Sequence, residues 1–371
     1  MTVEDSRWMA RALQVAHKGQ FWAAPNPHVG CVLVRDGEII GEGFTQPAGG
    51  NHAEVEALKD AGNASGATAY VTLEPCAHHG RTGPCSEALI EAGVTRVVVG
   101  LEDPNPAVSG KGLSRLTDAG VEVTCGLMAD QAREMLAGFL WRMERGRGRV
   151  TVKLASSLDG RTAMASGESH WITGAPARAD VQQLRAASSV ILTGSGSVIT
   201  DDCRLTLRAD ELTLSGAEVE RATRCPPQRA VLDSRLITPA SAQVYDDSAA
   251  TLLFHGADVA CTKHYPDSVE RIAVPLGGEG LDLHAVFAEL NERQHNEILV
   301  ESGPRLAGAL LQEGLVDRIL VYMAPVLMGS AANPLMMLPL DDMSQRVHLD
   351  TVDVRRVGQD WRFTLVPQVE H

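Results

Sequence analysis

The feature that most constrains the fold of this chain is an alternation of short apolar segments with segments of helical periodicity. In the first half, segments with the pattern of strands cover 29–35, 38–44, 69–73, 94–100 and 121–124. Segments with apolar residues at helical spacing cover 5–18, 52–61, 86–92, 112–119 and 129–141. Because strands that alternate with helices favour a sheet covered on both faces, we predict a three-layer α/β domain.

Two local signals refine this prediction. Asp5 or Ser6 is expected to cap the first helix, and Gly19 to end it. Asp36-Gly37 stands between the first two strands, and this dipeptide is a strong signal for a hairpin. These two strands are therefore expected to pair with each other.

The alternation starts again at about residue 150, which predicts a second α/β unit. Its predicted strands cover 150–155, 190–193, 230–232, 297–301 and 318–323, and its predicted helices cover 177–187, 284–292 and 306–313. The polar segment 209–227 receives no assignment. Residues 142–149, with four arginines and two glycines, are predicted to be a solvated linker. We therefore expect two domains, residues 1–148 and 149–371.

The charge balance disfavours a general nucleic-acid-binding protein. The chain has 371 residues, and its 33 Lys and Arg against 47 Asp and Glu give a formal net charge of −14 at pH 7. Nucleic-acid binding depends on basic residues that neutralise phosphates and on aromatic residues that stack on bases, and only 4% of this chain is aromatic. We expect a small-molecule partner held by a local basic pocket, and no nucleic acid.

Cysteine use and the N-terminal residues predict a cytoplasmic protein. Seven cysteines are too few for a disulfide scaffold and agree with a reducing compartment. The first residues are acidic and lack the basic-then-apolar pattern of a signal peptide. No stretch reaches the roughly 18 consecutive apolar residues of a membrane span. No membrane partner is therefore expected.

The sharpest chemical signal is a set of metal-ligating residues, His52, Cys76 and Cys85. One imidazole and two thiolates suit Zn²⁺ and leave the fourth tetrahedral position for water. Asn51 is expected to cap a helix that begins at His52. Glu54 lies two residues after His52, where a carboxylate that is not a ligand can move a proton between water and a leaving group. The sequence therefore predicts a catalytic zinc site that uses Glu54.

The number of protein ligands distinguishes two kinds of zinc site. A closed structural site would need a fourth ligand, which His78 or His79 could supply. Glu54 would then have no chemical task, so the catalytic site is the preferred interpretation.

The order His-x-Glu, Pro-Cys and Cys resembles the zinc-dependent nucleobase deaminases, whose generic pattern has two residues between the cysteines. Eight residues separate Cys76 from Cys85 here. This longer loop resembles that of the bifunctional deaminase/reductase family of bacterial riboflavin biosynthesis. Three further motifs agree with that family: Pro25-Asn26-Pro27, Asp103-Pro104-Asn105-Pro106 and Ser157-Leu158-Asp159-Gly160-Arg161. The resemblance covers nearly the whole chain and weakens at 209–227 and near the C-terminus.

For the first half, the resemblance implies a cytidine-deaminase-like domain that deaminates a diaminopyrimidinone bearing a phosphoribosylamino group. Glu54 would carry the proton, and ammonia would leave. Four residues match family positions that hold the substrate: Asn26, Arg81, Asp103 and Asn105. Asn and Asp also mark turns, which is the alternative role for these positions. The chain departs from the family at Gly83, where proline is common, and at Thr45, where some relatives have a substrate-contacting histidine.

The second half carries weaker signals of its own. Thr193-Gly194-Ser195-Gly196-Ser197 follows an apolar strand, but Ile199 stands where a dinucleotide-binding fingerprint needs a small residue, so a tight turn is favoured. Glu301-Ser302-Gly303-Pro304-Arg305-Leu306 ends a predicted strand and opens a helix with proline near its first turn. The N–H groups of such a terminus can hold a phosphate.

For the second half, the resemblance implies a dihydrofolate-reductase-like domain that uses NADPH to convert the ribosyl group to ribityl. The residues that match cofactor positions are Ala155, Trp171, Ser197, Asp201, Ser234, Gly303, Pro304, Arg305, Leu306, Ala307, Gly308 and Ala309. The residues that match substrate positions are Ser169, Arg185, Leu205, Arg208 and Glu301. Arg185 and Arg208 are expected to grip the ribose phosphate as forked donors. Lys153, in the first strand of this half, receives no assigned step.

Two other functions stay open at this point. One is a nucleic-acid-editing zinc deaminase with an appended binding module, which the charge of −14 and the long gap between the cysteines disfavour. The other is a deaminase whose second half is a degenerate scaffold, which the presence of Trp171, Arg185, Asp201 and Arg208 disfavours. The sequence does not decide the native metal, the passage of an intermediate between sites, or the oligomeric state, although α/β enzymes often form homo-oligomers.

Overall fold

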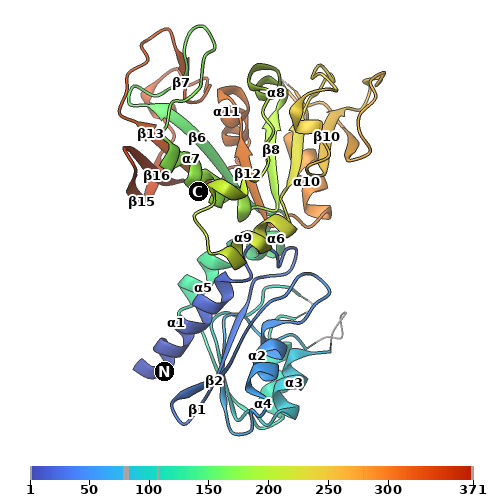
Figure 1. The fold of residues 1–371 in the computed structure, drawn as a ribbon, viewed down its shortest axis with the longest axis vertical. Helices are drawn as coiled ribbons and strands as arrows, with labels where there is room; N and C mark the ends of the chain where they lie inside the picture. The colour runs from blue at the N-terminus through green and yellow to red at the C-terminus, as the bar shows by residue number, and fades with distance from the viewer. Residues whose placement is uncertain (1, 78–82, 107, 279, 369–371) are drawn as a thin grey trace. The chain divides into compact units, whose positions relative to one another are not determined.

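The computed structural model describes residues 2–77, 83–106, 108–278 and 280–368. The chain divides into two compact units, Met1–Gly148 and Arg149–His371 (Figure 1). Within the described residues, the main sheet has five strands in the first unit and nine in the second. Both units therefore have the α/β character that the alternation predicted.

The sheet of the first unit has the strand order β2-β1-β3-β4-β5. Its strands are β1 (Gly30–Arg35), β2 (Glu38–Phe44), β3 (Thr68–Val71), β4 (Arg96–Val99) and β5 (Glu122–Cys125). β1 is antiparallel to β2 and β3, whereas β3, β4 and β5 are parallel. The predicted hairpin is confirmed, because Arg35 pairs with Glu38 and the intervening Asp36 and Gly37 have φ angles of 53° and 77°.

Helices cover both faces of this sheet because successive side chains of β1 point in opposite directions. Val32 and Val34 pack with α1 (Val3–His17). Cys31 and Leu33 pack on the opposite face with α2 (Ala53–Ala61), α3 (Cys85–Glu91) and α4 (Lys111–Asp118). Figure 1 shows α1 and α2 on opposite sides of β1 and β2. The predicted three-layer arrangement of the first unit is confirmed.

Two helix predictions in the first unit are wrong in detail. Thr2, rather than Asp5 or Ser6, caps α1, and Asp5 completes a capping box with it. Residues 129–141, predicted as one helix, form α5 (Ala129–Met135) and α6 (Ala137–Arg145). The break falls at Leu136, which is buried in the core. Packing of this side chain therefore overrides the continuous helical pattern.

Most of the predicted linker at 142–149 is regular structure. Arg142 and Arg145 belong to α6, and the Arg145 guanidinium lies 3.5 Å from the centroid of the Trp141 ring. Arg149 begins β6 (Arg149–Ser157) and forms an ion pair with Glu297 at 3.0 Å. The prediction of a linker is therefore wrong for Arg142, Arg145 and Arg149, which belong to regular elements, although Arg145 is exposed to solvent as predicted.

The sheet of the second unit has the strand order β11-β10-β9-β8-β12-β6-β13-β16-β15. The predicted strands are all present: β6, β8 (Val190–Gly194), β9 (Gln228–Leu232), β12 (Glu297–Glu301) and β13 (Arg318–Ala324). The sheet is parallel from β11 to β13, and β16 is antiparallel to β13 and β15. The strands that were not predicted are β7 (Arg161–Ala163), β10 (Thr251–Gly256), β11 (Val269–Val274), β14 (Asn333–Pro334), β15 (Leu349–Val357) and β16 (Asp360–Pro367). Most of these are short or lie toward a sheet edge, where exposed side chains interrupt the apolar pattern.

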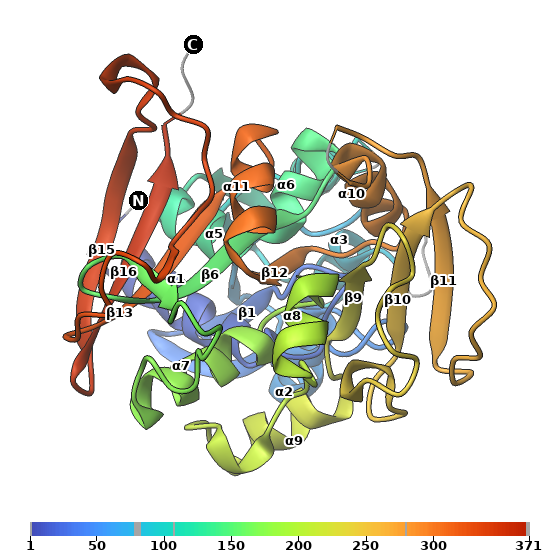
Figure 2. The same cartoon turned by 90° about the horizontal axis from the view of Figure 1, so that it is seen from above.

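Helices cover both faces of this second sheet as well. α10 (Leu283–Glu292) and α11 (Pro304–Gln312) pack on one face, and α7 (Ala175–Ala186) and α8 (Ser195–Asp201) pack on the other (Figure 2). The unassigned segment 209–227 contains η1 (Ala209–Glu211) and α9 (Gly216–Arg224). Two further short helices are η2 (Gln243–Tyr245) and η3 (Met343–Gln345). None of the described helices combines the length and the apolar character that crossing a bilayer requires.

Close packing of α2 on β2 generates a prediction about stability. A Cβ atom at Gly43 would lie 2.2 Å from the Ala53 carbonyl oxygen and 2.3 Å from the Ala57 nitrogen. The Gly43→Ala variant should therefore lose about 1–3 kcal/mol of unfolding free energy, because α2 must move away from the sheet. Urea denaturation followed by circular dichroism measures this, with Gly216→Ala as the control, since a Cβ atom there meets nothing within 4 Å. An unchanged midpoint for Gly43→Ala would contradict the close packing.

Candidate functional site

The three predicted metal ligands lie at the ends of elements in the first unit. His52 is the N-cap residue of α2, Cys76 follows β3, and Cys85 is the first residue of α3. The prediction that Asn51 caps α2 is wrong, because its amide donates to Glu56 at 2.6 Å and His52 occupies the N-cap position without a side-chain cap. The His52 imidazole instead faces the two cysteines.

The ligand atoms have the spacing of a tetrahedral zinc site. The Nδ1 atom of His52 lies 3.6 Å from Cys76 Sγ and 3.3 Å from Cys85 Sγ, and all three atoms lie within 4.8 Å of one another. Zn–N and Zn–S bonds of about 2.0 and 2.3 Å at tetrahedral angles separate nitrogen and sulfur by about 3.5 Å. The three side chains therefore fit a zinc ion. His78 and His79, the alternative fourth ligands, lie outside the described residues.

The surroundings of Cys76 favour a thiolate. Hydrogen bonding from the Cys85 thiol, with a smaller contribution from His52, lowers the pKa of Cys76 to about 4 against the opposing effect of burial. The Cys85 amide, which lies in the first turn of α3, donates to Cys76 Sγ at 3.4 Å. The Ser86 amide and hydroxyl both donate to the Cys76 carbonyl at 3.1 Å. Cys76 is thus held in place and favours the deprotonated state that a metal ligand requires.

Glu54 lies on the first turn of α2 and is only 3% exposed. Burial, followed by the charge of Cys76, raises the pKa of Glu54 to about 7. A carboxyl group with a pKa near neutrality both accepts and donates a proton readily at physiological pH. This is the property that proton transfer between water and a leaving group requires.

The predicted substrate residues of the first unit have different surroundings. The partly buried amide of Asn26 makes no side-chain hydrogen bond within the described part of the chain. Asp103 is buried and accepts the Asn105 amide at 2.8 Å, which is the turn role considered for it. Arg81 lies outside the described residues. The hydroxyl of Thr45 is buried and accepts a backbone amide at 3.0 Å, so this side chain has a structural contact where some relatives have a histidine.

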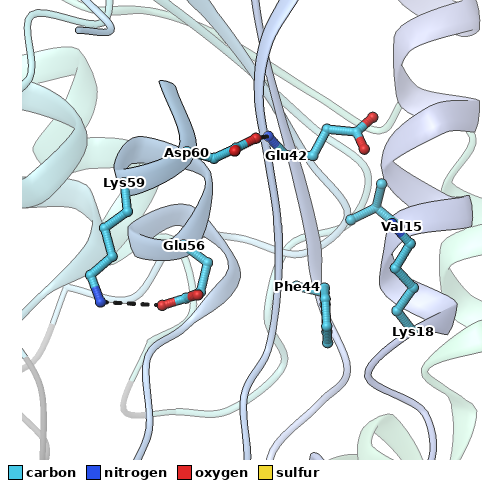
Figure 3. A pocket seen from close by; sticks show the side chains of 7 residues that line it. All are labelled: Val15, Lys18, Glu42, Phe44, Glu56, Lys59 and Asp60. Carbon is cyan, nitrogen blue, oxygen red and sulfur yellow. Dashed lines mark hydrogen bonds and ion pairs between the residues drawn. The ribbon is translucent and has the colours of Figure 1, made fainter. Parts of the chain in front are cut away.

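A surface hollow of the first unit contains none of these residues (Figure 3). All three of its carboxylates have partners. Glu42 pairs with Arg11 at 2.5 Å, Glu56 pairs with Lys59 at 3.3 Å, and Asp60 accepts the Glu42 amide at 2.9 Å. The hollow is lined by Val15, Lys18, Glu42, Phe44, Glu56, Lys59 and Asp60. Its opposed charges indicate no single class of ligand.

In the second unit, the neighbouring strands β8 and β12 lead into helices on opposite faces of the sheet, α8 and α11 (Figure 2). Ligands of open parallel sheets bind at the carboxyl ends of the strands where the connections reverse in this way. The segment 193–197, predicted to be a tight turn, is instead the junction of β8 and α8, with Gly194 as the N-cap. Gly303 caps α11 and Pro304 opens it, as predicted. The predicted cofactor residues Ser197, Asp201, Gly303, Pro304, Arg305, Leu306, Ala307, Gly308 and Ala309 lie on these two helices or at their starts.

Arg185 and Glu301 form a buried ion pair in this region. The Nε and Nη2 atoms of Arg185 donate to the two carboxylate oxygens at 2.6 and 3.0 Å, and Nη1 donates to the Thr206 carbonyl at 2.8 Å. Burial raises the pKa of Glu301, but Arg185 outweighs this effect and keeps that pKa below its usual value. In this geometry the forked donors of Arg185 face Glu301 and a carbonyl, and the role of Arg185 at the substrate phosphate stays a prediction. Arg208 remains near the surface, paired with Glu211 at 3.0 Å.

A second group of predicted residues surrounds Asp201. The hydroxyl of Ser169 donates to Asp201 at 3.2 Å, and His170 lies 3.9 Å from the same oxygen. Trp171 is 64% exposed, with the Arg178 guanidinium 4.6 Å from the centroid of its ring, so it is not a core residue. The remaining predicted residues are Ala155 in β6, Leu205 after α8 and Ser234 after β9.

Two further polar residues lie here: Lys153, which the sequence singled out without an assigned step, and Gln182, which sequence reasoning missed. Lys153 lies opposite Glu301 on the neighbouring strand, and burial lowers the pKa of Lys153. Its position as a lone charge within an apolar strand was a readable signal. Gln182 is buried and accepts the Arg208 amide at 3.0 Å, which no local pattern indicates.

Two family models match the chain. Residues 2–101 match the cytidine and deoxycytidylate deaminase zinc-binding region. Residues 149–363 match the RibD C-terminal domain. The predicted resemblance to a deaminase in the first half and a reductase in the second is confirmed.

Similar proteins cover the whole chain. The riboflavin biosynthesis protein RibD of Escherichia coli (strain K12) is 49% identical, with 98% of this chain and 100% of that protein covered. The structure of Acinetobacter baumannii RibD, form 1, is 41% identical with a TM-score of 0.88, and 99% of each chain is covered. A deaminase/reductase structure from Thermotoga maritima is 31% identical with a TM-score of 0.87, covering 98% of this chain and 99% of its own. The chain therefore belongs to the family of the riboflavin biosynthesis protein RibD, and it is a bifunctional deaminase and reductase that uses zinc and NADPH.

Proposed function

We propose that residues 1–148 deaminate a diaminopyrimidinone bearing a phosphoribosylamino group, and that residues 149–371 then reduce the ribosyl group of the product. The observation that carries this proposal is the cluster of His52, Cys76 and Cys85 close to the buried Glu54. The Thermotoga maritima relative is described as a diaminohydroxyphosphoribosylaminopyrimidine deaminase and 5-amino-6-(5-phosphoribosylamino)uracil reductase, which supports the same two steps here.

In the first step, His52, Cys76 and Cys85 would hold the zinc ion. When bound, zinc supplies a Lewis acid that makes water nucleophilic near neutral pH. Glu54 takes a proton from the attacking water and delivers a proton to the ring amino group. A C–O bond forms at the ring carbon, the C–N bond breaks, and ammonia leaves.

Four residues are assigned to hold the pyrimidine of the first step. Asn26 offers both a donor and an acceptor to the ring edge, because its amide has no side-chain hydrogen bond within the described residues. Asp103 shapes the loop by accepting the Asn105 amide. Asn105 and Arg81 are assigned to the substrate by the family resemblance alone. Arg81 is the positively charged residue of the four.

In the second step, NADPH supplies the hydride that reduces the opened sugar carbon. The N-terminus of α11 fits a cofactor phosphate, because Gly303 leaves its first turn without a side-chain cap. We assign Ala155, Trp171, Ser197, Asp201 and Ser234 to the same cofactor. We assign Arg185 and Arg208 to the substrate phosphate, and Ser169, Leu205 and Glu301 to the rest of the substrate.

The free thiols and the relatives support a proposal for the compartment and the partners of the enzyme. Seven free thiols, two of them proposed zinc ligands, suit the reducing cytoplasm. We propose that the chain forms a homo-oligomer and has no membrane or nucleic-acid partner. The nucleic-acid-editing alternative is not favoured, because relatives named as riboflavin biosynthesis proteins cover 98% of the chain.

Replacement of Glu54 tests the deaminase step. The Glu54→Gln variant should release ammonia about 10²–10⁴-fold more slowly, because an amide cannot carry the proton. Its zinc content and its oxidation of NADPH with the deaminated intermediate should not change. Glu56→Gln is the control, since Glu56 lies on the same helix and its carboxylate accepts only from Asn51 and Lys59 among the described residues. Ammonia release at the unaltered rate by Glu54→Gln would refute the proposed proton carrier.

Replacement of Arg208 tests the reductase step. The Arg208→Ala variant should raise the KM for the deaminated intermediate by about 10–100-fold, because one charged hydrogen bond to phosphate contributes about 1.5–3 kcal/mol. Ammonia release should not change. Arg224→Ala, which removes an exposed arginine of α9, controls for charge.

An NADPH titration of the unaltered protein accompanies this measurement. Saturable binding is expected. No detectable binding would instead favour a degenerate scaffold in the second half.

A further inference from the structure

The carboxylate of Glu74 accepts hydrogen bonds from four backbone N–H groups. Its Oε2 atom accepts from the amides of Asp103 and Gly110 at 3.2 and 3.0 Å. Its Oε1 atom accepts from the amides of Gly112 and Leu113 at 2.8 and 3.2 Å. Glu74 is only 4% exposed, so the four amides surround a buried carboxylate. We call this arrangement the Glu74 clamp.

The Glu74 clamp joins two segments that carry residues of the deaminase site. Only Pro75 separates Glu74 from the metal ligand Cys76. The Pro75 carbonyl lies directly against α4, because a Cβ atom at Gly112 would be 1.9 Å from its oxygen. On the other side, Asp103 donates its amide to the clamp and accepts the amide two residues later at 2.8 Å. One side chain therefore fixes the metal-ligand segment against the predicted substrate segment.

The clamp requires a carboxylate rather than an amide. α4 has no side-chain cap of its own, and Glu74 accepts from two N–H groups of its first turn. The first turn of a helix also favours a nearby negative charge. A glutamine would turn its NH₂ group toward two of the four donors and leave them without an acceptor.

We propose that Glu74 is a positioning residue for the deamination step. It sets the distance between the Cys76 segment and the Asp103 segment, and thereby the placement of the pyrimidine ring relative to the metal and Glu54. Glu74 itself contacts neither the substrate nor the reacting atoms, because its oxygens face the four amides. The inference rests on the proposed deaminase function of the first unit.

The Glu74→Gln variant of the full chain tests this inference. Ammonia release, bound zinc, and NADPH oxidation with the deaminated intermediate are measured on the same preparation. We expect kcat for ammonia release per bound zinc to fall about 10–100-fold, because a displacement of about 1 Å at a reacting centre costs up to about 100-fold in rate. NADPH oxidation should not change, since that site lies in the second unit. Glu102→Gln is the matched control, because Glu102 is exposed and its carboxylate accepts, within the described part of the chain, only the Ser109 hydroxyl at 3.2 Å.

An unchanged kcat per bound zinc in Glu74→Gln would overturn the inference, even if the variant binds less zinc or is less stable, because those losses indicate a structural role alone. If Glu74→Gln does not fold, Glu74→Asp is measured in the same way. This variant keeps the charge on a shorter side chain, and it should lose about tenfold in kcat per bound zinc. No loss there would overturn the inference. Absence of ammonia release from the unaltered protein would instead refute the proposed function, and the inference with it.

Discussion

Parallel strands of a sheet end at the same edge, and both sites of this enzyme depend on that constraint. In the first unit, β3 and β4 are parallel neighbours, and they lead into the segments that carry Cys76 and Asp103. In the second unit, β8, β12 and β6 are parallel neighbours that lead into Ser197, Gly303 and the turn after β6. Residues far apart in the sequence therefore come together at each proposed site.

Around these sites, buried charges have partners at close distance. Asp5 joins α1 to the sheet by accepting from Arg96 at 2.7 Å and from Tyr70 at 2.9 Å. Arg185 neutralises Glu301 beside the proposed substrate site. An unpaired buried charge would cost several kcal/mol, and removal of one partner from such a pair typically costs about 3–5 kcal/mol. These ion pairs and hydrogen bonds therefore allow the protein to hold charged side chains in fixed orientations beside the apolar cores of the two sheets.

The elements that sequence reasoning found are those with a strong local pattern. The hairpin at Asp36-Gly37 and the strand Glu297–Glu301 were predicted with their observed pairing or bounds. β15 was missed because nearly all of its residues are exposed, which removes the apolar alternation. α9 was missed although Ser215 and Glu218 form a capping box that was readable in the sequence. Local chemistry therefore predicted most core strands but not the buried β10, whereas edges and breaks depended on packing.

The available chemistry was readable from the residues alone. The order of His52, Glu54, Cys76 and Cys85 indicated zinc and a proton carrier, since few residue types can perform those tasks. Only the tertiary structure decided how the other polar residues are used. It pairs Arg185 with Glu301, and it directs Glu74 to four backbone amides. The physical reason is that distances between residues far apart in the chain are set by the packing of helices on the sheets, which no local pattern encodes.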